Sequence, residues 1–131
     1  MPPARHPFPR DCRLRARSDF DRAFRAGVRE KRGPYDVCCV LTGLPVTRLG
    51  LSIGRKAGNA VRRNRIKRIF REAFRLERHA LDPGFDYVVV PRGSGLDPTL
   101  DEARAIVATA FRAAARRAAD RAARARKPSG P

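Results

Sequence analysis

The sequence has few acidic residues, few cysteines and no long apolar run. Its 131 residues include 13 Asp or Glu against 30 Lys or Arg. The three cysteines form no C-x-x-C pair, and an odd number argues against a disulfide framework. No apolar run approaches the roughly 18 residues of a membrane span, and residues 1–17 lack the apolar centre of a secretory signal. These absences predict a cytoplasmic protein without a membrane anchor.

The basic residues that are present lie unevenly along the chain. Residues 54–78 hold ten basic and two acidic residues, residues 33–53 hold one of each, and residues 79–103 are net acidic. A hydrophobic fraction of 42% is enough for a core, and the length fits one domain. The formal net charge of +17 indicates a polyanionic partner, either nucleic acid or an acidic membrane surface.

The apolar spacing predicts seven elements in the order α-β-β-β-α-β-α. Helices are expected over 18–27, 59–78 and 99–117, and strands over 28–32, 35–42, 48–53 and 85–90. Ser18 is expected to cap the first helix, and Asp97 is a possible cap of the last one. The second and third strands are expected to pair as a hairpin. The predicted fold class is an α+β sandwich with a four-stranded mixed sheet.

Three regions follow from this pattern. Residues 1–12, which are rich in proline and arginine, are expected to form a flexible basic arm. Residues 13–117 are expected to form a single RNA-binding α+β domain. Residues 118–131 are rich in arginine and alanine and are expected to fray, so that Arg121 would lie in a loose tail.

The segment 50–75, GLSIGRKAGNAVRRNRIKRIFREAFR, is typical of a nucleic-acid-binding surface. A strand end is followed by a basic loop with two glycines, and then by a helix whose first turn offers free N–H groups to a phosphate. Asn64 adds an uncharged donor and acceptor. A solvated helix face usually mixes charges of both signs, whereas residues 54–78 hold only Glu72 and Glu77 against ten basic residues. The candidate RNA-binding residues are Arg55, Lys56, Arg62, Arg63, Asn64, Arg65, Lys67 and Arg68.

The same segment resembles the signature of the protein subunit of bacterial ribonuclease P. The matching pieces are GNAV at 58–61, RNR at 63–65, IKR at 66–68 and EAF at 72–74. The stretch RLRARSDFDRAFRAG at 13–27 is similar to the first helix of that family, and FDYVVVPR at 85–92 is similar to its late strand. The resemblance covers roughly residues 8–115.

This resemblance implies a function. Ribonuclease P removes the 5′ leader of precursor tRNA by hydrolysing one phosphodiester bond, and its RNA subunit is the catalyst, with Mg²⁺. The protein subunit binds that RNA and the leader, and it needs no cofactor and no protein partner of its own. The resemblance also implies a left-handed crossover between the third and fourth strands, although such connections are right-handed in about 98% of proteins.

The resemblance places Phe20 and Phe24 at a leader-binding cleft between the first helix and the sheet. Ordinary core packing of both rings is the alternative, and if the roles divide, we expect Phe20 to contact the leader and Phe24 to pack the helix on the sheet. An aromatic residue on the second strand is also expected in the cleft. Either Tyr35 takes that place or Cys39 replaces it.

Two other classes of function compete with this one. A ribosomal or ribosome-assembly protein would share the charge and the RNA partner. A stand-alone protein nuclease would need a base, a nucleophile or a metal cage. The acidic group Asp97, Asp101 and Glu102 lies near a helix start, where capping is its expected role, and Cys38 and Cys39 point to opposite faces of a strand. The sequence therefore predicts a binding subunit without catalytic residues.

Overall fold

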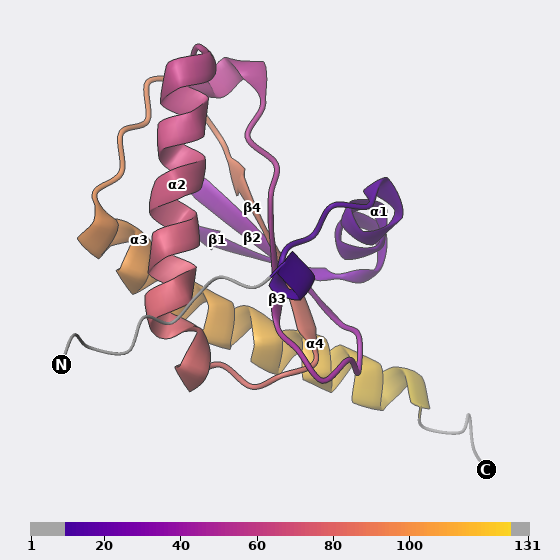
Figure 1. The fold of residues 1–131 in the computed structure, drawn as a ribbon. Coiled ribbons are helices and arrows are strands. Elements are labelled where there is room, and N and C mark those ends of the chain that lie inside the picture. Colours follow the sequence, from indigo (N-terminus) through magenta and orange to yellow (C-terminus); the bar gives the residue numbers. More distant parts are fainter. Residues whose placement is uncertain (1–9, 127–131) are drawn as a thin grey trace, which may run out of the picture.

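A computed structural model describes residues 10–126, which form a four-stranded sheet with helices on both faces (Figure 1). One face is covered by α1 and the other by α2 and the C-terminal helical segment. The helices are α1 (Arg17–Ala26), α2 (Ala60–Glu77), α3 (Leu100–Ile106) and α4 (Arg112–Arg126), with a π-helical turn (Val107–Phe111) between the last two. The strands are β1 (Val28–Arg32), β2 (Tyr35–Leu41), β3 (Arg48–Leu51) and β4 (Phe85–Pro91). The α+β sandwich is confirmed.

The strand order β1-β2-β4-β3 corrects one prediction. β2 pairs antiparallel with β1 and β4, and β3 pairs parallel with β4, so β2 and β3 do not form a hairpin. β4 lies between β2 and β3, and its Tyr87, Val88 and Val89 are fully buried between the helices on the two faces of the sheet. The sheet is mixed, as predicted. The handedness of the β3–α2–β4 connection stays a prediction.

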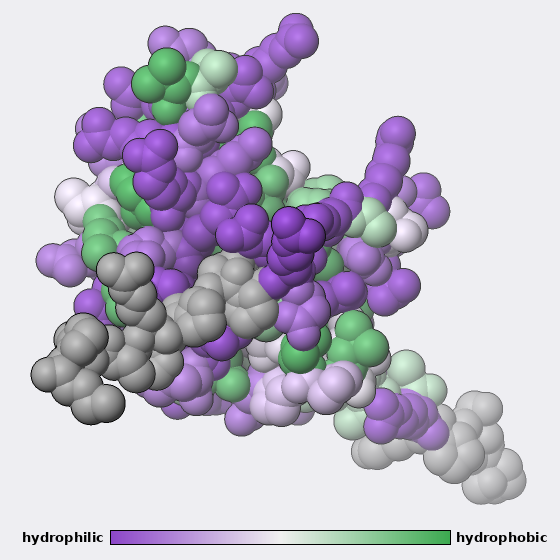
Figure 2. Space-filling view, viewed as in Figure 1, coloured by the Kyte–Doolittle hydropathy of each residue, from purple (hydrophilic) through white to green (hydrophobic). Residues whose placement is uncertain are grey.

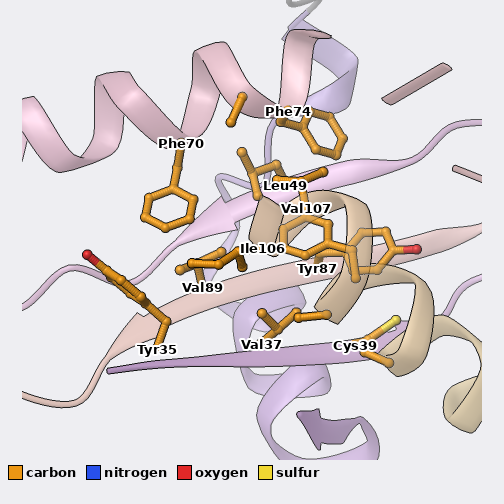
Figure 3. Packing of buried hydrophobic residues seen from close by; sticks show 14 of the residues in the cluster. Tyr35, Val37, Cys39, Leu49, Phe70, Phe74, Tyr87, Val89, Ile106 and Val107 are labelled. Atoms are coloured by element: carbon orange, nitrogen blue, oxygen red, sulfur yellow. The ribbon is translucent and has the colours of Figure 1, made fainter. Parts of the chain in front are cut away.

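The main core fills the space between the sheet and the helices α2, α3 and α4. In Figure 3, Tyr35, Val37 and Cys39 of β2 point toward Phe70 and Phe74 of α2. Tyr87 stacks on Phe111, with ring centroids 4.5 Å apart. In the last helical segment, helical spacing places Ala103, Ile106, Val107, Ala110 and Phe111 on one face, and all five are buried.

A second, smaller cluster packs α1 on the opposite face of the sheet. Leu14, Ala23, Cys38, Val40 and Val88 form it, with Phe20 partly buried against them. Cys38 and Cys39 therefore belong to different clusters, as the alternation of a strand predicts. All three cysteines are free and buried.

The ends of several elements differ from the predictions. α1 begins at Arg17 after Ala16, so Ser18 lies within the helix and does not cap it. Thr99 caps α3 instead of Asp97, since its hydroxyl accepts the Glu102 backbone N–H at 3.1 Å.

The outer boundaries of the predicted domain also move. α4 continues past the predicted end at Arg117 to Arg126, because Ala118 is buried against the core. Residues 118–126 are therefore helical, whereas 127–131 lie outside the described residues. Of the predicted arm, residues 1–9 also lie outside them, and Arg10–Cys12 form a 3-10 turn with Cys12 buried. Among residues 10–126 no helix has the length and apolar character needed to cross a membrane.

Candidate nucleic-acid interface

The start of α2 is built by Gly58 and Asn59. Gly58 has φ of 140°, and a Cβ there would lie 2.8 Å from Cδ of Arg62, so this turn requires glycine. The Asn59 side chain caps the helix by accepting the Arg62 backbone N–H at 2.9 Å. The preceding 3-10 turn, Arg55–Ala57, exposes Arg55 and Lys56 at the entrance to the helix. The loop and the helix start thus present their basic side chains together.

The outer face of α2 carries a basic hollow. Asn64, Arg68, Arg71 and Arg75 line an open hollow of about 480 Å³ together with Glu72 of α2 and Arg13 of the N-terminal segment. At 100° per residue, Asn64, Arg68, Arg71 and Arg75 fall on one arc of the helix. Where α2 is visible in Figure 2, its surface is mostly hydrophilic. We call this hollow the α2 face.

Several basic side chains of this region bind groups of the chain itself. Arg62 donates to the Leu96 carbonyl at 3.1 Å, so its guanidinium fixes the loop before α3. Arg65 lies 3.4 Å from the Asp97 carboxylate, on the exposed surface. Arg75 is paired with Glu72, and this pairing lowers the pKa of Glu72. These contacts are competitors of any RNA phosphate at the same guanidinium groups.

Other side chains of the same surface carry no such pairing. Within residues 10–126, no ion pair shorter than 4 Å is formed by Arg55, Lys56, Lys67, Arg68 or Arg71. The Nε atom of Arg63 is buried and has no hydrogen-bond partner in that part of the chain. Like charges crowd here: partial desolvation and then the nearby Arg13 guanidinium lower the pKa of Arg71. The surface therefore favours an anion that brings several negative charges.

A second hollow lies at the β3 edge of the sheet, on the side of α1. Its volume is about 150 Å³. Leu49 and Leu51 supply apolar surface and Phe20 an aromatic ring, and the other lining residues are Arg13, Leu14, Arg15, Lys67 and Arg71. Because Arg13 and Arg71 line both hollows, this edge groove is continuous with the α2 face. Arg13 carried no sequence signal, since it reaches the site through an isolated parallel bridge to Leu49.

The two candidate aromatic residues of α1 differ in position. Phe20 packs on Gly50, where a Cβ would lie 2.8 Å from its ring, and the same ring lines the edge groove. Phe24 is 40% exposed, and the ring centroids of the pair are 6.5 Å apart. The packing role expected for Phe24 is therefore wrong, because Phe20 is the ring that packs α1 on the sheet.

Tyr35 does not lie in a cleft beside α1. It is 3% exposed and packs edge-on against Phe70, with ring centroids 5.1 Å apart (Figure 3). Cys39 shares this face and is fully buried. Because alternate residues of a strand point to opposite faces, the β2 side chains toward α1 are Asp36, Cys38 and Val40. Both alternatives considered for the strand aromatic position in the cleft are thereby corrected.

The placement of α1 depends on charged residues that the sequence did not single out. Arg48 of β3 donates to both carboxylate oxygens of the fully buried Asp86, at 2.8 and 2.7 Å. Its guanidinium also lies 3.4 Å from the carboxylate of Asp19 in the first turn of α1. No local sequence pattern indicates these ion pairs, because Asp86 and Asp19 are 38 and 29 positions away from Arg48. The bridge links α1 to the two strands beneath it.

The buried acids of the sheet are held by arginines. Asp36 lies between Arg29 and Arg92, at 3.5 and 2.9 Å, just as Asp86 is bound by Arg48. Across residues 10–126, no three His, Cys, Asp or Glu side chains come together in the manner of a metal site. What the described surface offers is a basic groove with one aromatic ring at its end.

Comparisons with known proteins agree with this geometry. A family model described as Ribonuclease P matches residues 8–118. The ribonuclease P protein component of Thermotoga petrophila is 42% identical over 85 residues, which is 65% of this chain and 73% of that protein. The protein component of Oleidesulfovibrio alaskensis is 42% identical over 97 residues, which is 70% and 77% of the two chains.

Solved structures show the same relationship. The RNase P protein of Thermotoga maritima matches with a TM-score of 0.57 at 41% identity, over 61% of this chain and 73% of that one. A Staphylococcus aureus RNase P protein, described as a mutant with defective mRNA degradation activity, matches with a TM-score of 0.68 at 27% identity, over 77% and 89%. This chain belongs to the family of ribonuclease P protein components, the protein part of a ribonucleoprotein endonuclease.

Proposed function

We propose that the chain binds the catalytic RNA of ribonuclease P through the α2 face and holds the 5′ leader of precursor tRNA in the edge groove at Phe20. The protein then assists the Mg²⁺-dependent removal of the leader that leaves the mature 5′ end. One observation carries the proposal: the two hollows share Arg13 and Arg71, so one RNA-binding surface runs from the helix to the aromatic ring.

Charge and geometry support the first half of the proposal. Arg55 and Lys56 before α2, and Lys67, Arg68 and Arg71 on it, form no ion pair within the described residues, so these cations are available to the phosphates of a folded RNA. Arginine adds a planar fork that binds two phosphate oxygens at once. Arg63 and Asn64 lie at the same end of α2, and we propose that they, with Arg62 and Arg65, complete the contact with the catalytic RNA.

The edge groove supports the second half. A leader is single-stranded RNA, and unpaired bases bind by stacking on aromatic rings while cations follow the backbone. Phe20 supplies the ring, and Arg15 and Lys67 lie beside it in the same hollow. Phe24, although exposed, stands outside the groove, so we assign the leader contact to Phe20.

The chemistry of the phosphodiester bond is assigned to the RNA subunit. Mg²⁺ would act there, activating water and neutralising the charge that develops on phosphate oxygens. In this proposal the residues of this chain bind the catalytic RNA and orient the leader. Asp36 and Asp86 lie beneath arginines, so their carboxylates serve the packing of the sheet and α1.

Reconstitution with the catalytic RNA tests this function. Precursor tRNA cleavage at low Mg²⁺ should rise when the protein is added, and the double variant Arg68→Ala/Arg71→Ala should lose most of that gain. Arg124→Ala/Arg126→Ala, which removes two exposed arginines of α4, is the control for net charge. Binding to ribosomal RNA without any gain in cleavage would favour the ribosome-assembly alternative, and cleavage by the protein without RNA would favour a protein nuclease.

A further inference from the structure

The position of α1 on the sheet is only weakly set by apolar contacts. Ala23 is the single buried residue among the ten residues of this helix. The cluster beneath it holds five buried residues, against more than twenty in the main core. A short helix with so little buried apolar surface needs other contacts to stay in one place.

An arginine holds the first turn of α1. The Arg48 fork is fixed by the buried carboxylate of Asp86, and the Nη2 atom that bonds Asp86 also lies 3.4 Å from the Asp19 carboxylate. Both carboxylates are largely shielded from water, with side-chain exposures of 0% for Asp86 and 18% for Asp19. A planar guanidinium between two carboxylates fixes direction as well as distance.

A second arginine holds the last turn of α1 from a distant element. Nη1 of Arg121 lies 2.9 Å from the carbonyl of Gly27 and 3.4 Å from that of Ala26. The final carbonyls of a helix lack partners within the helix, and a cation at this end is favoured by the helix dipole. One turn earlier in α4, Arg117 donates to the Arg29 carbonyl and to the Glu30 carboxylate, both at 2.9 Å. These contacts fix α4 along β1 and thereby place Arg121.

The Arg121 contact lies beyond the part of the chain that matches the family model. That match ends at residue 118, whereas α4 continues to Arg126 and buries Ala118 at its midpoint. Packing against the main core involves only the buried face of α4 and does not require a contact with α1. In the distal half of α4, Arg121 instead reaches the carbonyls at the end of α1.

We propose that Arg48 and Arg121 are positioning residues that hold the two ends of α1 and so fix Phe20 at the leader-binding groove. This inference rests on the proposed function of that groove. Arg48 acts near Phe20, at one end of the helix, and Arg121 acts at the other end through the terminal carbonyls. The distal half of α4 thereby tunes leader binding without touching the leader.

The experiment compares Arg121→Ala and Arg121→Lys with the control Arg124→Ala, which removes the same charge one turn further along α4. Holoenzymes are reconstituted, and the affinity for precursor tRNA with a leader of about ten nucleotides is divided by the affinity for mature tRNA. Arg121→Ala should lower this ratio about 3- to 10-fold, since one charge-assisted hydrogen-bonding site is lost. Arg121→Lys, which keeps one donor and the charge, should recover part of the loss.

A second measurement separates positioning from general stability. Hydrogen exchange of the free protein should quicken in the α1 amides of Arg121→Ala and stay unchanged in β4, while the catalytic RNA binds as tightly as it does to Arg124→Ala. Equal ratios for Arg121→Ala and Arg124→Ala would overturn the inference, as would faster exchange throughout the sheet. A ratio of one for the unmodified holoenzyme would instead refute leader binding at the groove, which is the proposed function itself.

Discussion

The salt dependence of RNA binding follows from the unpaired cations of the α2 face and its entrance. Arg55, Lys56, Lys67, Arg68 and Arg71 form no ion pair within the described chain, so each is available to replace a condensed counterion on a phosphate. Five such contacts predict that log K falls against log salt with a slope of about −3.5 to −4.5, for single strands and duplexes respectively. Between 50 and 200 mM salt the affinity should then fall roughly 100- to 500-fold.

Fluorescence anisotropy with labelled catalytic RNA at a fixed Mg²⁺ concentration measures this slope. The double variant Arg68→Ala/Arg71→Ala should make the slope shallower by about 1.4 to 1.8, two counterions fewer. Arg124→Ala and Arg126→Ala, exposed on α4, serve as the matched control and should leave it unchanged. A slope near zero would refute the electrostatic account. The same loss from the α4 pair would show that charge number decides and its placement does not.

Three further predictions concern aromatic residues and the buried bridge. Phe20→Ala should weaken leader-dependent binding by about 1–3 kcal/mol and lower the thermal midpoint. Phe24→Ala should change the free energy of unfolding by less than about 0.5 kcal/mol. A lower thermal midpoint for Phe24→Ala than for Phe20→Ala would contradict this prediction. Burial raises the pKa of Tyr35 to about 12. The stability that this shift contributes is therefore present below pH 10 and is lost as the pH rises toward 12. An ultraviolet absorbance titration of the folded protein that shows Tyr35 ionising near pH 10 would disprove this prediction. Asp86→Ala should lower the free energy of unfolding by about 3–5 kcal/mol, because Arg48 loses its buried partner, and an unchanged urea midpoint would argue against a structural bridge.

The sequence predicted what depends on neighbours along the chain. The arc of Asn64, Arg68, Arg71 and Arg75 follows from 100° per residue in a helix, and the structure gathers these side chains in one hollow. The core positions of the last helix were predictable for the same reason. Local periodicity is therefore enough to orient a helix whose two faces differ in polarity.

Strand pairing and strand orientation were less accessible. Six of the seven residues of β2 are buried, so no alternation of polar and apolar residues indicates which side chains point toward α1. Tyr35 was assigned to the wrong face for this reason. The hairpin prediction was wrong because β4 lies between β2 and β3 in the sheet, although β4 begins 34 residues after the end of β3.

Arg48 shows a further limit of sequence reasoning. It reads as an ordinary charged residue at the start of a strand, and both of its carboxylate partners come from elements far away in the chain. Arg121 was assigned to a fraying end because alanine and arginine alone predict no tertiary contact. Tertiary contacts between elements that are far apart in the chain produce no periodic pattern in the sequence.

The isolated bridge between Arg13 and Leu49 has a consequence for the behaviour of the chain before it meets RNA. β3 is an outer strand, and residues 13–14 run beside it, with the Leu14 N–H donating to the Leu49 carbonyl at 2.9 Å. Unpaired edges recruit strands from other copies, a route to aggregation. The opposite edge, β1, is blunted by the exposed Arg29, Lys31 and Arg32. Residues 13–14 thus cover part of the β3 edge and limit self-association. Their removal should make the protein precipitate when its RNA is scarce.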